Sequence, residues 1–206
     1  EVSPPAYDSY TEPLYYVYDY DGTTVTYAKA TQNYQVYGVL YNWPAAVTAC
    51  PSGWHTPTDA EWEQLAQYIS DQMGPYSKSA NNTWGEVGNH LKSTNGWNNN
   101  GNGTDDFGFS GFPGGNRYSG DSFGYIGNYG YWWGATEYNT ALAWNRYMYY
   151  YNSNVLRYNY SKKFGFSVRC VKDYTGSQPN GNILSNDYKD GEGNTYDAVV
   201  IGNQLW

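Results

Sequence analysis

Aromatic side chains, most of them tyrosine, recur along the whole chain and limit the folds that it can adopt. The 206 residues include 26 Tyr, 9 Trp and 6 Phe. These rings supply ample surface to bury, which excludes an intrinsically disordered chain. Apolar residues never form a run long enough for a membrane-spanning helix, and Leu, Glu and Lys are too scarce for a coiled coil. We therefore expect a globular fold of one domain, or of two small ones.

Charged residues are few, and their balance is acidic. They make up 15% of the chain, with a formal net charge of −8, whereas an average globular chain has about 25%. Nucleic acid is therefore a poor partner. A surface rich in Tyr, Asn, Gly and Ser is typical of contact with sugars or other proteins. Alternatively, a secreted protein gains its solubility from these hydroxyls and amides instead of from charges.

The two cysteines, Cys50 and Cys170, are far apart in the sequence. A disulfide between them would close a loop of about 120 residues, stabilise the fold by roughly 4–5 kcal/mol and indicate an oxidising compartment. Two free buried thiols are the alternative. A zinc site is not predicted, because the chain has no Cys-x-x-Cys pair and only two histidines, His55 and His90. No signal peptide precedes Glu1, as we expect of a processed chain.

The strongest helix signal lies in residues 53–69. Thr58 is the expected N-cap and Glu61 the third helical residue, so the two form a capping box. Apolar residues then recur at helical spacing, which predicts one buried stripe: Trp62, Leu65, Ala66 and Ile69. The acidic residues at the start of this helix are explained by the helix dipole without a catalytic role.

The remaining elements are predicted to be short. Residues 1–13 form an extended arm, and 14–27 a β-hairpin that turns at Asp21-Gly22. A buried strand over 36–43 precedes a second helix that starts at Pro44. Further β-runs follow residue 141, with a hairpin turn at 152–154.

A long irregular stretch, dense in Gly and Asn, lies between the helices and the later strands. Asn100, Asn102, Asp105 and Asp106 cluster there, and their oxygens are ligands that calcium accepts. The spacing of an EF-hand is absent, and turn formation by Asn and Asp also explains the pattern. Calcium is the only cofactor that the sequence suggests.

The character of the chain changes after Asp173. Residues 174–186 are predicted to be a polar linker, and 187–206 a terminal β-hairpin that turns at Asp190-Gly191-Glu192-Gly193-Asn194. Its second strand is expected to run from Tyr196 to Trp206.

Several motifs over about residues 37–173 resemble the Fibrobacter succinogenes major paralogous domain family. Many rare Trp and Gly positions agree in order, so the resemblance is specific. The motifs include Gly38-Val39-Leu40-Tyr41-Asn42-Trp43-Pro44, Cys50-Pro51-Ser52-Gly53-Trp54-His55, Pro57-Thr58-Asp59-Ala60-Glu61-Trp62, Gly130-Tyr131-Trp132-Trp133 and Gly165-Phe166-Ser167-Val168-Arg169-Cys170-Val171.

The resemblance implies a bacterial protein that is extracellular or located on the cell surface. It implies an α+β, C-type-lectin-like domain over 14–173, near the formylglycine-generating enzyme group, with two short helices, small antiparallel sheets, long ordered loops and a C-terminal strand segment. It also implies that Cys50 and Cys170 pair. The oxidase chemistry of the formylglycine group uses two active-site cysteines, whereas Cys50 and Cys170 are better explained as a disulfide. Neither histidine has an evident nucleophile beside it. We therefore predict no enzymatic activity.

One segment is displaced relative to the family pattern. A stretch similar to residues 190–206 normally opens the domain, whereas here it closes the chain. Because first and last strands pair in C-type-lectin-like folds, the domain would lack its own opening strand and expose a groove. The terminal strand either folds back into its own domain, inserts into a neighbouring subunit, or belongs to the next unit of a tandem array.

Two functions follow from these alternatives. The first is a structural subunit of an extracellular filament, polymerised head to tail through a donated strand: Ala198, Val199, Val200, Ile201, Gly202, Asn203, Gln204, Leu205 and Trp206. The second is a lectin-like module for carbohydrate or protein, with the strand folded back. Tyr147, Tyr149, Tyr150 and Tyr151 are the candidate ligand or interface aromatics, and other copies of the chain or glycans are the expected partners.

Overall fold

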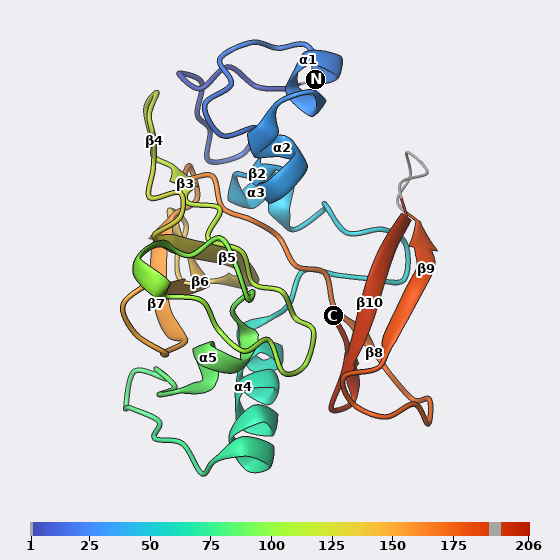
Figure 1. The fold of residues 1–206 in the computed structure, drawn as a ribbon. Helices are drawn as coiled ribbons and strands as arrows, with labels where there is room; N and C mark the ends of the chain where they lie inside the picture. Colours follow the sequence, from blue (N-terminus) through green and yellow to red (C-terminus); the bar gives the residue numbers. More distant parts are fainter. Residues whose placement is uncertain (1, 190–194) are drawn as a thin grey trace.

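The computed structural model describes residues 2–189 and 195–206, so the turn predicted over 190–194 lies outside the described residues. The described chain is α+β, with short helices and small antiparallel sheets (Figure 1). The elements in chain order are β1 (Tyr15–Tyr16), α1 (Val25–Lys29), α2 (Gln32–Tyr37), β2 (Leu40–Tyr41), α3 (Trp43–Ala46), α4 (Asp59–Met73), α5 (Val87–Leu91), the 3-10 helix η1 (Asn98–Asn100), β3 (Asn116–Arg117), β4 (Phe123–Gly124), β5 (Tyr129–Glu137), β6 (Leu142–Tyr149), β7 (Leu156–Ser161), β8 (Lys172–Asp173), β9 (Ile183–Lys189), β10 (Thr195–Ile201) and β11 (Gln204–Leu205).

The antiparallel sheet β5-β6-β7 lies at the centre of the molecule. Tyr131 pairs with Tyr147 across β5 and β6, and Arg146 pairs with Arg157 across β6 and β7. The hairpin turn predicted at 152–154 joins β6 to β7 and is confirmed. Because side chains alternate along a strand, this sheet presents two different faces.

Helix α4 covers one face of that sheet, and its predicted start is confirmed. The Thr58 hydroxyl accepts a hydrogen bond from the Glu61 backbone N–H, while the Glu61 carboxylate accepts one from the Thr58 N–H, which completes the capping box. The predicted stripe is buried: Trp62, Leu65, Ala66 and Ile69. The second predicted helix is also present, as the single turn of α3 with Pro44 in its first turn.

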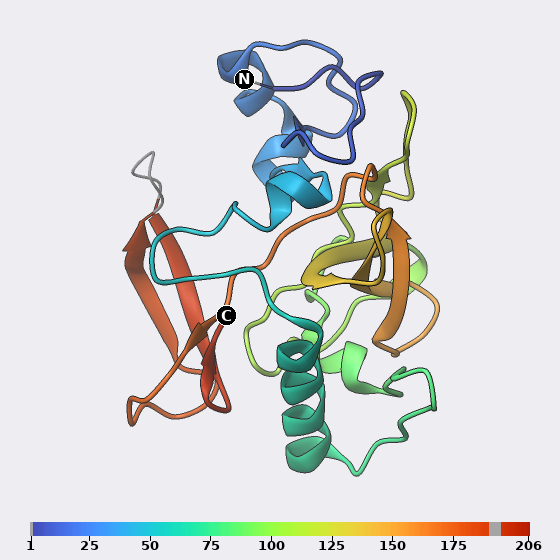
Figure 2. The same ribbon diagram turned by 180° about the vertical axis from the view of Figure 1, so that it is seen from behind.

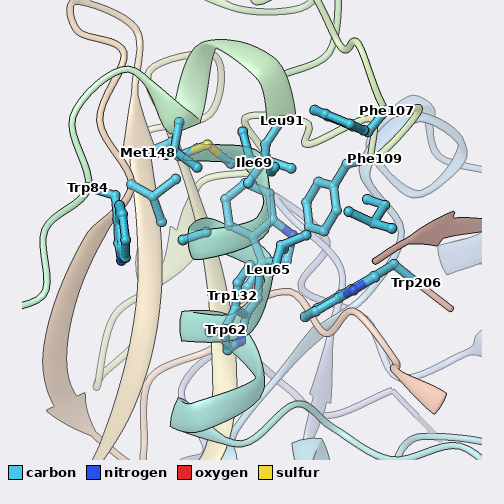
Figure 3. Packing of buried hydrophobic residues seen from close by; sticks show 14 of the residues in the cluster. Trp62, Leu65, Ile69, Trp84, Leu91, Phe107, Phe109, Trp132, Met148 and Trp206 are labelled. Atoms are coloured by element: carbon cyan, nitrogen blue, oxygen red, sulfur yellow. The ribbon is translucent and has the colours of Figure 1, made fainter. Parts of the chain in front are cut away.

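The main core lies between α4 and the sheet (Figure 3). Side chains from α4, from α5 and from the long loop before β3 meet there with Trp132 of β5 and Met148 of β6. Trp206, from the end of the chain, also lies in this core and faces Phe109 and Trp62. The core therefore combines residues from distant parts of the sequence.

A second aromatic cluster covers the opposite face of the sheet. Tyr131 and Trp133 of β5 pack there on Phe166, with Tyr131 stacked on Phe166 at a centroid distance of 4.8 Å. The segment around Phe166 is held by a bridge to Tyr41. Rings therefore fill both sides of one sheet, which accounts for much of the aromatic content.

The hairpin predicted over 14–27 is wrong. Tyr15 and Tyr16 pair with β2, Tyr16 opposite Leu40, and Val25–Lys29 is a helix. The run 23–27 has β-prone residues, but Ala28 packs beside Val2 and Val17 in a small cluster, and this tertiary contact overrides the local preference. The helices α1, α2 and α5 are additions to the two that the sequence predicts.

The described part of the N-terminal arm has no regular element, as predicted, but it is packed onto the domain. Arg117, which is fully buried, donates hydrogen bonds to the carbonyls of Pro5, Tyr7 and Lys163. A guanidinium has five N–H donors, so one side chain can hold several carbonyls at once.

The disulfide between Cys50 and Cys170 is present, with an S–S distance of 2.11 Å. The alternative of two free thiols is therefore wrong. The bond ties the loop between α3 and α4 to the segment that leads to β8, and His55 bridges Val171 close to it.

Candidate functional site

The end of the chain forms a small sheet with the strand order β8-β11-β10-β9. The sequence predicts one strand from Tyr196 to Trp206, whereas the structure has β10, a turn at Gly202-Asn203 and the short β11. Gly202 has a φ of +64°, which favours glycine. The turn brings Trp206 beside Val199, and their backbones exchange two hydrogen bonds of 2.9 and 3.0 Å.

This C-terminal segment, described over residues 183–189 and 195–206, is anchored to the domain by its last residues. Residues 198–201 and 204–206 are all buried, and Val199, Ile201 and Trp206 belong to the main core. The Trp206 ring lies 5.1 Å from that of Trp62 on α4, centroid to centroid. The Gln204 side-chain amide donates to Gln64 of the same helix at 3.3 Å. In this single chain the terminal strand therefore packs on its own domain, as in the first of the three alternatives.

The connection between the domain and this segment lies at the surface. Residues 175–180 are all exposed. Its ends are fixed by hydrogen bonds from the Tyr174 N–H to the Asn203 carbonyl and from the Gly181 N–H to the Val200 carbonyl, both 2.8 Å. Strand β9 begins at Ile183, inside the range 174–186 expected as a linker. Figure 1 shows the β9–β10 hairpin beside the domain, away from the β5-β6-β7 sheet.

Tyrosines line the face of the central sheet that lies opposite α4. Tyr147 stacks between Tyr131 and Tyr149, with centroid distances of 5.5 and 5.4 Å. Tyr149 then contacts Tyr151 at 4.5 Å, and Tyr151 is 61% exposed. The rings therefore form a continuous row from the second cluster to the solvent, which we call the tyrosine row: Tyr131, Tyr147, Tyr149 and Tyr151.

Three hydroxyls of the tyrosine row, those of Tyr131, Tyr147 and Tyr151, have a raised pKa. Burial raises the pKa of Tyr131 and of Tyr147 well above the ordinary value for tyrosine. A hydrogen bond with Tyr149 raises the pKa of Tyr151 to about 12. The row therefore offers uncharged rings and hydroxyls at neutral pH, a chemistry suited to stacking and hydrogen bonding.

Three of the four predicted interface tyrosines, Tyr147, Tyr149 and Tyr151, belong to the tyrosine row. Tyr150 packs against the main core, and its ring also meets that of Tyr151 edge to face at 5.2 Å. The sequence alone could not assign the faces, because it did not show where β6 ends.

Three of the four residues predicted to bind calcium have hydrogen-bond partners within the protein. The side-chain amide oxygen of Asn102 accepts from the Trp97 N–H at 3.0 Å. The Asp105 carboxylate accepts from the Ser110 N–H and hydroxyl, both at 2.7 Å, and Asn100 adopts a φ of +60° in η1. Asp106 contacts His90 and Thr104. These contacts support the turn-forming interpretation, and calcium stays a prediction.

Among residues 2–189 and 195–206, no three His, Cys, Asp or Glu side chains lie close enough to hold a metal ion.

Both ring nitrogens of His90 have partners that the sequence did not reveal. Nδ1 lies 2.5 Å from Asp106, and Nε2 lies 2.8 Å from the Tyr76 hydroxyl. His90 is buried, and its ring also stacks on Tyr76. These bonds join α5 to the segments that hold Tyr76 and Asp106, so a structural role accounts for His90. His55, the other histidine, is exposed and lies 2.5 Å from Glu61 of the capping box.

Comparison with known proteins identifies the family. A family model described as the Fibrobacter succinogenes major domain matches residues 5–172. Neither the curated proteins nor the solved structures include a match, so the C-type-lectin-like fold stays a prediction. No helix of the described residues is long and apolar enough to cross a membrane. Because the match covers most of the sequence, the chain belongs to the Fibrobacter succinogenes major domain family.

Proposed function

We propose that the protein is a structural subunit of an extracellular bacterial filament. Each copy would place its C-terminal segment in the core of the next copy. The observation that carries this proposal is a core completed by residues attached only through an exposed connection.

The core depends on the segment for large apolar side chains. Val199, Ile201 and Trp206 lie against α4 and Phe109, and burying each contributes about 1.5–3 kcal/mol. A domain without the segment would expose the rings of Trp62 and Phe109. Such a domain would bind a C-terminal segment strongly, and a second copy of the chain carries the same segment.

Exchange of the segment would preserve the buried contacts. The side-chain neighbours of Trp206 are the same whether the segment comes from its own chain or from another. Only the exposed connection must change shape, and nine residues, 174–182, span at most about 30 Å when extended. Because the donor and acceptor surfaces differ, the contact is head to tail, and it produces an open filament when successive copies do not close into a ring.

The surface chemistry is compatible with close packing of copies. Charged residues make up only 15% of the chain, and the net charge is −8. A surface with so few charges limits the repulsion between neighbouring copies. The tyrosine row offers neutral rings for lateral contacts. The disulfide favours an oxidising location, which supports an extracellular position or one on the cell surface.

The length of the connection tests the proposal, because a short connection disfavours the closed form. Deleting residues 176–179 should increase the fraction of high-mass species in size-exclusion chromatography with light scattering. Inserting eight Gly and Ser residues at the same place should increase the monomer fraction. If both variants and the parent protein remain monomers as concentration rises, exchange is wrong.

A binding module is the second candidate, favoured by the segment's place on its own domain and by the tyrosine row. Neutral carbohydrate is the matching ligand, because stacked rings and hydroxyls bind sugar faces and edges. A glycan array would test it, with Tyr151→Ala against Tyr27→Ala, an exposed tyrosine on α1. Binding that is lost only in Tyr151→Ala supports the module, and an array without binding contradicts it.

A further inference from the structure

A cavity of about 300 Å³ lies between the disulfide and the C-terminal segment. Trp54 lines it from the loop between α3 and α4, and Tyr188, Tyr196 and Trp206 line it from the segment. Figure 2 shows this loop extending from α3 to the β9–β10 hairpin and returning to α4. The Trp54 and Tyr188 rings meet edge to face at 4.6 Å and join the two sides.

Arg169 brings a positive charge to this aromatic cavity. Its Nη2 donates to the Phe109 carbonyl, and its guanidinium lies 4.6 Å from the centre of the Phe109 ring. Burial lowers the pKa of Arg169 to about 10, so the group remains a cation at neutral pH.

Arg169 lines the cavity and brings its guanidinium to it. The Nε of this guanidinium is buried and has no hydrogen-bond partner within the described residues. Buried donors without a partner are rare in native proteins. The acceptors of the described residues thus leave part of the guanidinium unsatisfied, and an anionic group in the cavity would be attracted to it.

We propose that the cavity binds a small monoanionic carboxylate that carries a ring. The carboxylate would pair with the Arg169 guanidinium, and the ring would lie among Trp54, Tyr196 and Trp206. Asp197 also lines the cavity and disfavours a second negative charge on the ligand. The proposal does not depend on exchange, because the same residues line the cavity whichever copy supplies the segment.

Two pairs of probes test this chemistry and separate its two sources, a sugar acid and an aromatic acid. Isothermal titration would compare D-glucuronate with D-glucose, and benzoate with benzyl alcohol. We expect one acid to bind saturably in the millimolar range or below, and its neutral counterpart at least about tenfold more weakly, because a charge-assisted bond is lost. If neither acid binds, or if acid and neutral probe bind equally, the proposal is wrong.

Variants assign the binding to the cavity. Arg169→Gln should remove the preference for the acid over its neutral counterpart. Trp54→Ala should weaken binding of the acid by about tenfold or more. Tyr27→Ala, which alters a tyrosine outside the cavity lining, should bind as the parent protein does. If Arg169→Gln fails to fold, Trp54→Ala still tests whether the acid binds in the cavity. Equal binding by Trp54→Ala and Tyr27→Ala would overturn the proposal.

Discussion

Asp59, at the first turn of α4, binds two arginines of the central sheet. Its carboxylate accepts from Arg146 at 2.6 Å and from Arg157 at 2.8 and 3.0 Å. Arg146 is 2% exposed and also binds Glu63 at 2.9 Å. Sequence reasoning assigned these carboxylates to the helix dipole. The arginines could not be predicted, because they are about ninety residues away, whereas the capping box needs only positions three apart.

Asp59→Asn should lower the free energy of unfolding by about 2–3 kcal/mol at pH 7, because two buried charge-assisted bonds weaken. Burial alone would raise the pKa of Asp59, but hydrogen bonds from Arg157 and Arg146 hold it below its usual value. The stabilisation is therefore present above about pH 4 and is lost as pH falls through the depressed pKa. Urea unfolding at pH 7 and pH 3 would measure both effects.

Asp71→Asn is the matched control, since Asp71 is an exposed carboxylate of the same helix. Its effect should stay within about 0.5 kcal/mol. Equal effects of the two variants would contradict a structural role for the Asp59 network.

Among the elements, those with local signals were predicted and those fixed by distant contacts were not. Helix α4 and the β6–β7 turn have capping and turn residues within a few positions. The strand β1 needs Leu40 as its partner, so the sequence around Asp21-Gly22 misled the prediction. The strand predicted from Tyr196 to Trp206 continues only to Ile201, where the turn at Gly202 interrupts it.

Trp206→Ala should lower the free energy of unfolding by about 3–5 kcal/mol, because it leaves a cavity between Trp62 and Phe109. Denaturant unfolding would show the change. Tyr27→Ala, on a ring that is 70% exposed, should change stability by less than about 0.5 kcal/mol. A loss below about 1 kcal/mol for Trp206→Ala would mean that the segment is not part of the core.

The disulfide links the loop before α4 to the irregular segment before β8. Replacing both cysteines by serine should lower the free energy of unfolding by about 4 kcal/mol, because the bond joins residues 120 positions apart. Thermal unfolding with and without reductant would test it. Reductant should affect the parent protein and leave the double variant unchanged, and an unchanged parent would contradict this role.

At the scale of the described chain, a segment follows the family domain. The family model ends at residue 172, yet the buried residues beyond that position complete the main core. The motifs predicted the family and the disulfide, because they preserve the order of rare residues. The motifs could not show that the segment docks on α4. In the described residues its strand pairing with the domain involves only β8, and the contact with α4 is made by side chains.

Exchange of the C-terminal segment between copies is the central claim, and one cross-link tests it directly. The side-chain amides of Gln64 and Gln204 lie 3.3 Å apart, so Gln64→Cys with Gln204→Cys places two thiols where the segment meets α4. The assembled protein would be oxidised and run on a denaturing gel without reductant. We expect a ladder of covalent multiples that collapses to a single band after reduction. A single monomer band before reduction, with the two new cysteines joined within one chain, would contradict the account.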